Sequence, residues 1–295
     1  MSNNLHLLLK LLIAEDDREI IAHISKELVK MGGSIVADLQ KVADSHTDVM
    51  VIDTIEEIIH KIHCQELSPE LTHWAKYRDE DLLEGLLLVA SFQYCDMAIN
   101  EITEHLAELI RCATDDVSPT YATSRAVSII SHNIYHLFEY RVASEADCSH
   151  DIRLYYINDI LARRKTCPTL MAAIYYLCTK QLNIPTWFID TPNELTLGFG
   201  QRIVRPKEGN SYKSKKNNAL KIDFFLNIHT GNIDSFDTFK AKLENSDISD
   251  PLGCLIPVDN KRVVQRLFEE LAQIYKNSRN RARYTELKKL AQILN

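Results

Sequence analysis

Residues 155–200 read YYINDILARRKTCPTLMAAIYYLCTKQLNIPTWFIDTPNELTLGFG, and this stretch decides the fold. Its first segment ends in a basic run at residues 163–165, which suits the negative end of a helix. Pro168 fits the first turn of a second, apolar helix that closes near residue 181. The apolar run at residues 187–190 then predicts a strand, and residues 195–199 predict another. Helices followed by strands predict an α+β core.

The rest of the chain is predicted to be predominantly helical, because apolar residues recur every three or four positions. Residues 1–66 predict short helices in two pairs, which are similar to a HEAT-like repeat or form a small N-terminal helical cap. The segment LSPE at residues 67–70 predicts a break and a helix restart at Pro69, and we place a domain boundary there. The remaining domain is divided into a helical part, a core helix with its sheet, and a closing helical hairpin, at residues 67–150, 151–245 and 255–295.

Composition narrows the class of protein. The 295 residues are 45% apolar and 25% charged, which is typical of a globular protein with a sizeable core. A net charge of -7 argues against binding of nucleic acid or of an anionic membrane surface. Residues 5–14 are apolar but fall well short of the roughly 20 residues that span a bilayer. Seven cysteines, odd in number and never spaced as C-x-x-C, indicate reduced thiols in a cytoplasmic protein.

Several segments carry a family resemblance. Residues 154–157 read LYYI, residues 163–168 read RRKTCP, and residues 182–185 read LNIP, while residues 81–90 read DLLEGLLLVA and residues 225–227 read FLN. In order and spacing they resemble the motifs of the transglutaminase-like superfamily, in its bacterial SirB-type branch. The resemblance covers residues 79–295 and implies a papain-like core with a small antiparallel sheet and a C-terminal helical hairpin.

The chain departs from this family at the residues that would perform chemistry. Where the family has a Pro-Gly-His-Phe element after the helix, this chain has PNEL at residues 192–195, so Glu194 stands at the histidine position. The position of the third, carboxylate member falls on Asn227, and Pro168 stands near the place where transglutaminases have cysteine. The resemblance therefore implies that the catalytic triad is degenerate.

A rearranged thiol site is the alternative. A thiol hydrolase needs a thiolate, a base within hydrogen-bond reach and a group that orients the base. Cys167 is the candidate nucleophile, because the positive end of its helix and the basic residues nearby lower a thiol pKa. Glu194 is a weak base for a thiol of pKa about 8.5, since its own pKa is about 4. His229 is predicted to share a face with Asn227 and is the candidate base. Structural roles for Cys167 and His229 remain open.

Two residue pairs near the helix start are candidate binding residues. Tyr155 and Tyr156 are placed to line a pocket, with core packing as the alternative. Arg163 and Arg164 are placed to hold an anionic group, with compensation of the helix-end charge as the alternative.

Histidine spacing raises the question of a metal site. His60, His63 and Cys64, and separately His132 and His136, have spacings typical of metal ligands. Neither set has a third ligand nearby in sequence or the glutamate of a HExxH motif. We interpret both sets as partly exposed helix residues and predict no metal and no cofactor.

These observations favour a non-catalytic, degenerate transglutaminase-like protein with a binding or regulatory role. Its expected partner is a protein or a small peptide. The alternative is a cysteine-dependent amidase, acyltransferase or peptidase that uses Cys167 with a relocated base. A third possibility is a scaffold whose N-terminal helices supply the interaction surface.

Overall fold

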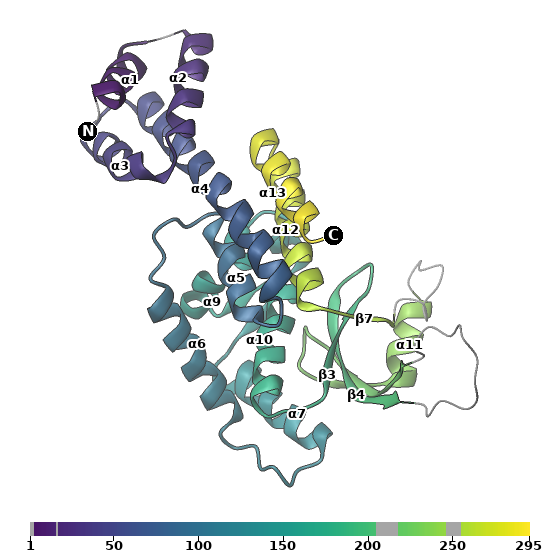
Figure 1. Cartoon of the computed structure of the whole chain (residues 1–295). Coiled ribbons are helices and arrows are strands. Elements are labelled where there is room, and N and C mark those ends of the chain that lie inside the picture. The colour runs from purple at the N-terminus through teal and green to yellow at the C-terminus, as the bar shows by residue number, and fades with distance from the viewer. Residues whose placement is uncertain (1–2, 16, 205–217, 246–254) are drawn as a thin grey trace. The chain divides into compact units, whose positions relative to one another are not determined.

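The computed structural model describes residues 3–15, 17–204, 218–245 and 255–295 (Figure 1). Its contacts divide the chain into two compact units, which are Met1–Arg78 with Leu88–Met97, and Asp79–Leu87 with Ala98–Asn295. Among the described residues, none of the helices combines the length and the apolarity that crossing a membrane requires.

The first unit is built of helices around an apolar core. Leu28, Leu39 and Ile55 are fully buried in that core. Asp17 and Asp48 begin two of the helices, because each side chain accepts a hydrogen bond from a backbone amide of the first turn. The helices are α1 (Asn3–Ala14), α2 (Arg18–Lys30), η1 (Gly33–Ile35), α3 (Val36–Ser45) and α4 (Val49–Tyr77), with part of α5 (Leu82–Ser91).

Helix α4 corrects one expectation from the sequence. It continues through Pro69, so the predicted break and restart at residues 67–70 is wrong, and the boundary placed at residue 66 falls inside this helix. A proline inside a helix costs about 3 kcal/mol because it removes a hydrogen bond and crowds the preceding turn. Leu67, Leu71 and Trp74, spaced three and four residues apart, are buried on both sides of Pro69. Burial of these side chains offsets the local cost of the proline.

The second unit contains the remaining helices and all the described strands. Its helical elements are α6 (Ile99–Thr114), α7 (Thr123–Ser131), η2 (His132–Leu137), α8 (Glu145–Cys148), η3 (Ile152–Tyr155), α9 (Ile157–Arg163), α10 (Pro168–Gln181), α11 (Phe236–Glu244), α12 (Asn260–Asn277) and α13 (Arg281–Ile293). Its strands are β1 (Arg141–Val142), β2 (Lys165–Thr166), β3 (Thr186–Asp190), β4 (Leu195–Val204), β5 (Asn218–Leu226), β6 (Ile233–Ser235) and β7 (Pro257–Val258). This predominantly helical α+β class is the one that the sequence predicted.

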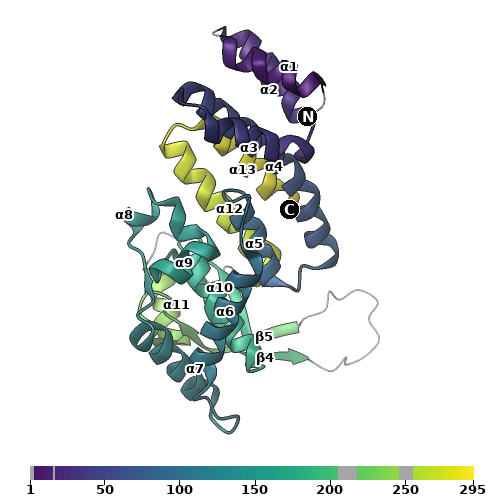
Figure 2. The same ribbon diagram turned by 90° about the vertical axis from the view of Figure 1, so that its left-hand side faces the viewer.

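The larger sheet has the order β6-β5-β4-β3-β7, and every neighbouring pair is antiparallel. Figure 2 shows β4 and β5 as its long central pair. The Phe188 ring packs against the ring of Tyr176 of α10, whereas its neighbour Ile189 packs with Phe239 and Leu243 of α11. Successive strand residues point to opposite faces, so α10 and α11 cover the two faces of the sheet.

Candidate functional site

The junction before α10 holds Cys167 in a fixed place. Strand β2 pairs in parallel with β1, and the Cys167 amide donates to the Leu154 carbonyl oxygen at 3.0 Å. Cys167 is the N-cap of α10, and its sulfur accepts a hydrogen bond from the Leu170 amide at 3.4 Å. Pro168 follows in the first turn, as the sequence predicted. The sulfur therefore lies at the N-terminus of the helix.

The environment of Cys167 disfavours a thiolate. The residue is 0% exposed, and burial followed by the charge of Glu270 raises the pKa of its thiol well above the ordinary value. The Leu170 amide opposes this shift without reversing it. The expectation of a lowered pKa is therefore wrong in direction, because burial outweighs the helix end. Such a thiol stays protonated near neutral pH.

Glu194 and His229 meet at one end of the sheet. Leu197 of β4 lies opposite Leu226 of β5, so the residues just before β4 and just after β5 are neighbours. The His229 Nε2 atom lies 2.8 Å from a Glu194 carboxylate oxygen. This hydrogen bond, opposed by partial burial, raises the pKa of His229 above its ordinary value of 6.5. An imidazole and a carboxylate thus lie within hydrogen-bond distance of each other.

The other two predicted catalytic residues, Asn227 and Cys167, form no hydrogen bond or ion pair with the side chains of this pair among the described residues. The Asn227 side-chain oxygen accepts hydrogen bonds from the His229 and Thr230 amides at 3.1 Å and 3.2 Å, so it shapes the turn. Within the described parts of the chain, no hydrogen bond or ion pair connects Cys167 to His229. The structure therefore contains an imidazole–carboxylate pair and, separately, a buried thiol.

An ionic network that the sequence did not indicate lies between β3, α10 and α12. Asp190 at the end of β3 pairs with Arg262 at 2.6 Å and also with Arg266. Arg266 donates further to the Thr191 carbonyl oxygen at 2.8 Å and pairs with Glu270 at 2.8 Å. The Asp190 and Arg266 side chains are only 13% and 12% exposed. These contacts fix α12 to the sheet end that also bears Glu194.

Glu270 connects this network to the start of α10. One carboxylate oxygen accepts hydrogen bonds from Thr169 and Arg266, each at 2.8 Å. The other oxygen is buried, and no described residue forms a hydrogen bond with it. Burial raises the pKa of Glu270 although Arg266 opposes the shift. The four-residue spacing of Arg262, Arg266 and Glu270 predicts that they share one face of α12, which is the part of the network that the sequence could indicate. The sequence could not indicate the contact with Asp190, because Asp190 is 72 residues from Arg262 in the chain.

The predicted binding residues have structural contacts. Tyr155 and Tyr156 are buried, and the Tyr155 hydroxyl donates to the Cys148 carbonyl oxygen at 3.0 Å. Arg163 pairs with Asp151 at 2.9 Å. Arg164 ends α9 with a left-handed backbone, at φ 53°. The burial of the two tyrosines is consistent with core packing, and a binding role for the four residues stays a prediction.

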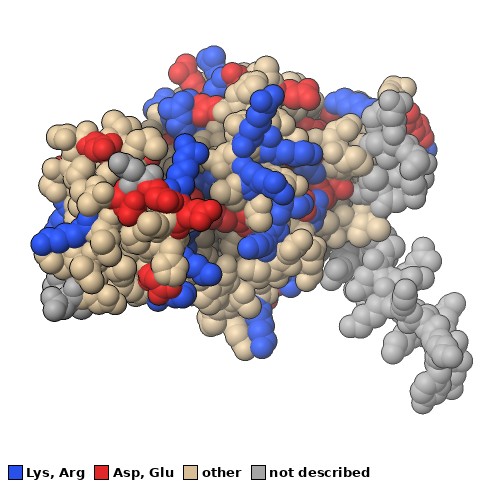
Figure 3. All heavy atoms as spheres, turned by 90° about the horizontal axis from the view of Figure 1, so that it is seen from above, with Lys and Arg blue, Asp and Glu red and all other residues tan. Residues whose placement is uncertain are grey.

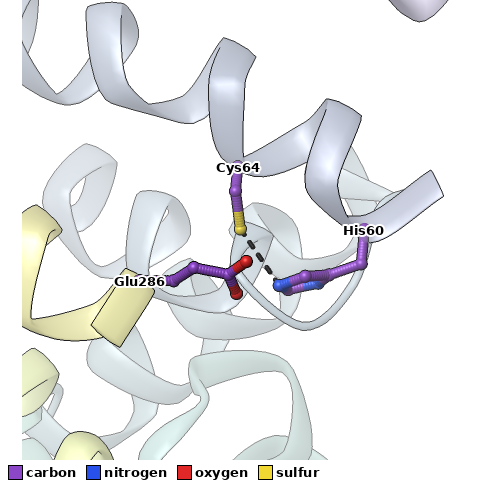
Figure 4. Close-up of side chains that lie close together, drawn as sticks. All are labelled: His60, Cys64 and Glu286. Carbon is purple, nitrogen blue, oxygen red and sulfur yellow. Dashed lines mark hydrogen bonds between the residues drawn. The ribbon is translucent and has the colours of Figure 1, made fainter. Parts of the chain in front are cut away.

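Two residues with metal-like spacing contact each other on α4. His60 and Cys64 project from the same side of the helix, and the His60 Nε2 atom lies 3.0 Å from the sulfur (Figure 4). His60 is 6% exposed and its ring packs edge-on against Phe92, so the interpretation of a partly exposed histidine is wrong for this residue. His132 and His136 are exposed, with ring centroids 5.5 Å apart. The absence of a bound metal stays a prediction.

The comparisons with known proteins agree with the fold. A search of curated proteins and a search of solved structures gave no match. The model of the transglutaminase-like superfamily matches residues 100–269, a range that includes α10, the whole of β3 to β6 and most of α12. This range is more than half of the chain and contains the Cys167 junction, the Glu194–His229 pair and Arg266. The chain therefore belongs to the transglutaminase-like superfamily.

Proposed function

We propose that this protein is a non-catalytic member of its superfamily that binds a protein or a small peptide. The observation that carries the proposal is the state of Cys167, which is fully buried and whose pKa is raised. A nucleophilic thiol must be accessible to substrate and must ionise, and this residue meets neither requirement. In our proposal Cys167 serves as the cap of α10.

The ionic network gives further support. Asp190, Arg266 and Glu270 occupy the region around the N-terminus of α10 with contacts among themselves. Burying such charges is costly unless they are paired, so this arrangement is suited to holding elements together. Glu194 stands at the family's histidine position and is engaged by His229.

The Glu194–His229 pair favours a second candidate function. A histidine oriented by a carboxylate supplies the base of a cysteine-dependent amidase, acyltransferase or peptidase. That function would require Cys167 to become exposed beside His229. We rank it second, because the burial of the thiol opposes it.

Finer assignments belong to the same proposal. We infer a place in the bacterial SirB-type branch from the motifs around residues 154–185, and a HEAT-like character for the paired N-terminal helices. We also infer a cytoplasmic location from the spacing of the cysteines.

Alkylation separates the two candidate functions. The folded protein is treated with iodoacetamide over a range of pH, and the modification of each cysteine is followed by mass spectrometry. We expect Cys167 to react more slowly than the exposed Cys95 at every pH, and to react freely only after unfolding. The pKa of Cys95 is itself raised to about 11 by partial burial and Asp96, which makes the comparison stringent.

The variant His229→Ala is the control for an activated thiol. If Cys167 is the cap of α10, this substitution leaves its alkylation rate unchanged. Fast modification of Cys167 alone, with an apparent pKa well under about 8 that rises in His229→Ala, would overturn the proposal and establish the cysteine enzyme.

A further inference from the structure

Strand β3 has an open edge at its beginning. Within the described residues, its partner on that edge, β7, pairs with Phe188 and Ile189. Pro257 has no amide hydrogen, so the hydrogen-bonded pair must be Phe188 with Val258. Thr186 lies two residues before Phe188 and therefore turns its amide and carbonyl toward the same edge. Strand β7 ends at Val258, and no other described strand lies beside Thr186 on that edge.

A cleft of about 490 Å³ lies at this open edge. Its volume falls within the range of about 300–1,000 Å³ that small ligands occupy in proteins. Its residues are contributed by the end of α10, by β3 and β7, by the start of α12, and by the segment before α5. Those used below are Glu80, Tyr176, Thr186, Trp187, Phe188 and Asp259.

Aromatic side chains stand on both faces of the strand at the cleft. The tilted rings of Tyr176 and Phe188 are in contact, with centroids 4.4 Å apart, on the face that α10 covers. Trp187 points to the opposite face, and its indole nitrogen donates to the Gly200 carbonyl oxygen at 3.0 Å. A strand added at this edge would point alternate side chains toward these two aromatic surfaces.

The opposite rim of the cleft is held in place. Lys180 donates to the Glu80 carbonyl oxygen at 2.9 Å. The Asn260 side chain donates to the carbonyl oxygens of Asp79 and Glu80, at 2.8 Å and 3.3 Å. A rim fixed before binding lowers the ordering cost that a ligand must overcome.

The charge of the cleft selects a cationic partner. Asp79 pairs with Lys261 at 3.3 Å. Glu80 and Asp259 are exposed, and among the described residues no basic side chain forms an ion pair with either of them. Among the residues that line the cleft, Glu80 and Asp259 are two such carboxylates and Lys180 is the basic residue, so the cleft carries an excess of negative charge. Opposite charge on a partner would be attracted there.

We propose that the β3 edge at Thr186 binds an extended peptide segment that carries a lysine or arginine side chain. The segment adds a short strand to the sheet, places its cation near Glu80 and Asp259, and packs its apolar side chains, which alternate with the cationic ones, on one of the two aromatic surfaces, that of Tyr176 or that of Trp187. This inference names the surface for the proposed binding role and rests on that role. It does not depend on the chemical state of Cys167, which lies at the other end of α10.

The test uses the full chain and the fluorescein-labelled peptide TKVKVT, titrated by fluorescence anisotropy at low ionic strength. We expect it to bind about tenfold more tightly than TEVEVT, in which the charge is reversed. We also expect it to bind about tenfold more tightly than TKPKPT, whose prolines lack the amide donors of a strand. Binding should slow hydrogen exchange at the Thr186 amide, measured by nuclear magnetic resonance.

A matched pair of variants locates the site. Glu80→Lys should weaken binding of TKVKVT about fivefold or more, whereas Glu104→Lys, the same charge change at an exposed position of α6, should leave the affinity within about twofold. No binding of TKVKVT, equal binding of TKPKPT, or equal effects of the two variants would each overturn the inference. These outcomes leave the alkylation of Cys167 unchanged, so a failure here is distinguishable from a failure of the non-catalytic assignment.

Discussion

At Cys167 two opposing effects act on one thiol. A helix N-terminus stabilises a nearby negative charge by about 0.3–1 kcal/mol. Full burial shifts a pKa by up to about 3–5 units, each worth about 1.36 kcal/mol. The residue is 0% exposed, so burial dominates and the thiol pKa rises. A cysteine at the start of a helix is therefore not an activated nucleophile unless solvent also reaches it.

His229 offers a titration that tests the pairing with Glu194. We expect its pKa, measured by nuclear magnetic resonance, to lie above 6.5, because the Glu194 hydrogen bond favours the protonated imidazole. Glu194→Gln should lower this pKa while the other histidine signals keep their positions. An unchanged His229 pKa in this variant would contradict the pairing.

The same pairing has a consequence for stability. The folded-state pKa of His229 is raised, so its stabilisation is fully present below 6.5 and is lost as pH rises through the folded-state pKa. The imidazole is about half exposed, which makes the effect modest. As the pH rises from 6.5 through the folded-state pKa of His229, the wild type should therefore lose slightly more stability than the Glu194→Gln variant does.

Helix α12 is connected to the sheet by charged side chains. Arg266 contacts Asp190 at the end of β3 and Glu270 on its own helix. Glu270 in turn accepts a hydrogen bond from Thr169 in the first turn of α10. One guanidinium group thus links three elements at the end of the sheet.

Removing that guanidinium should be costly. Arg266→Ala leaves Glu270 without its charged partner and Asp190 with Arg262 alone, and breaking a buried pair in this way costs about 3–5 kcal/mol. We expect a large fall in the denaturant concentration at the midpoint of unfolding, measured by circular dichroism. Arg111→Ala is the control, because its pair with Glu108 is exposed and screened by solvent, so its loss should change stability little. Equal losses in the two variants would contradict the importance of the network.

For the molecule as a whole, net charge limits the class of partner. The chain carries a charge of -7, and acidic and basic side chains both appear on the face shown in Figure 3. An acidic protein repels phosphate backbones and attracts cationic segments. This balance agrees with the acidic cleft beside β3.

Electrophoresis with a labelled DNA duplex tests this conclusion. At physiological salt we expect the full chain to cause no retardation at concentrations up to about 10 μM, a range in which nonspecific binding by basic proteins is seen. A basic protein mixed with the same duplex serves as the positive control. A salt-sensitive shifted band formed by this chain would contradict the prediction.

Local patterns in the sequence were sufficient to predict the class of fold and the helix start at residues 167 and 168. Three- and four-residue spacing predicted the helices, and Pro168 placed Cys167 at the start of α10. The same local reasoning failed at Pro69, because the helix there is maintained by buried side chains on both sides of the proline. Local signals describe what a segment prefers, and packing can override that preference.

The sequence by itself determined that Cys167 begins a helix, whereas the place of Glu194 at the family's histidine position stays a prediction. Only the tertiary structure decided the state of that site. Glu194 and His229 are 35 residues apart in the chain, and Asp190 and Arg266 are 76 apart. Burial and long-range pairing depend on which distant segments the fold brings together. Burial sets the direction of the pKa shift of Cys167, and the pairing with Glu194 sets that of His229. Neither shift can be predicted from the residues next to them in the sequence.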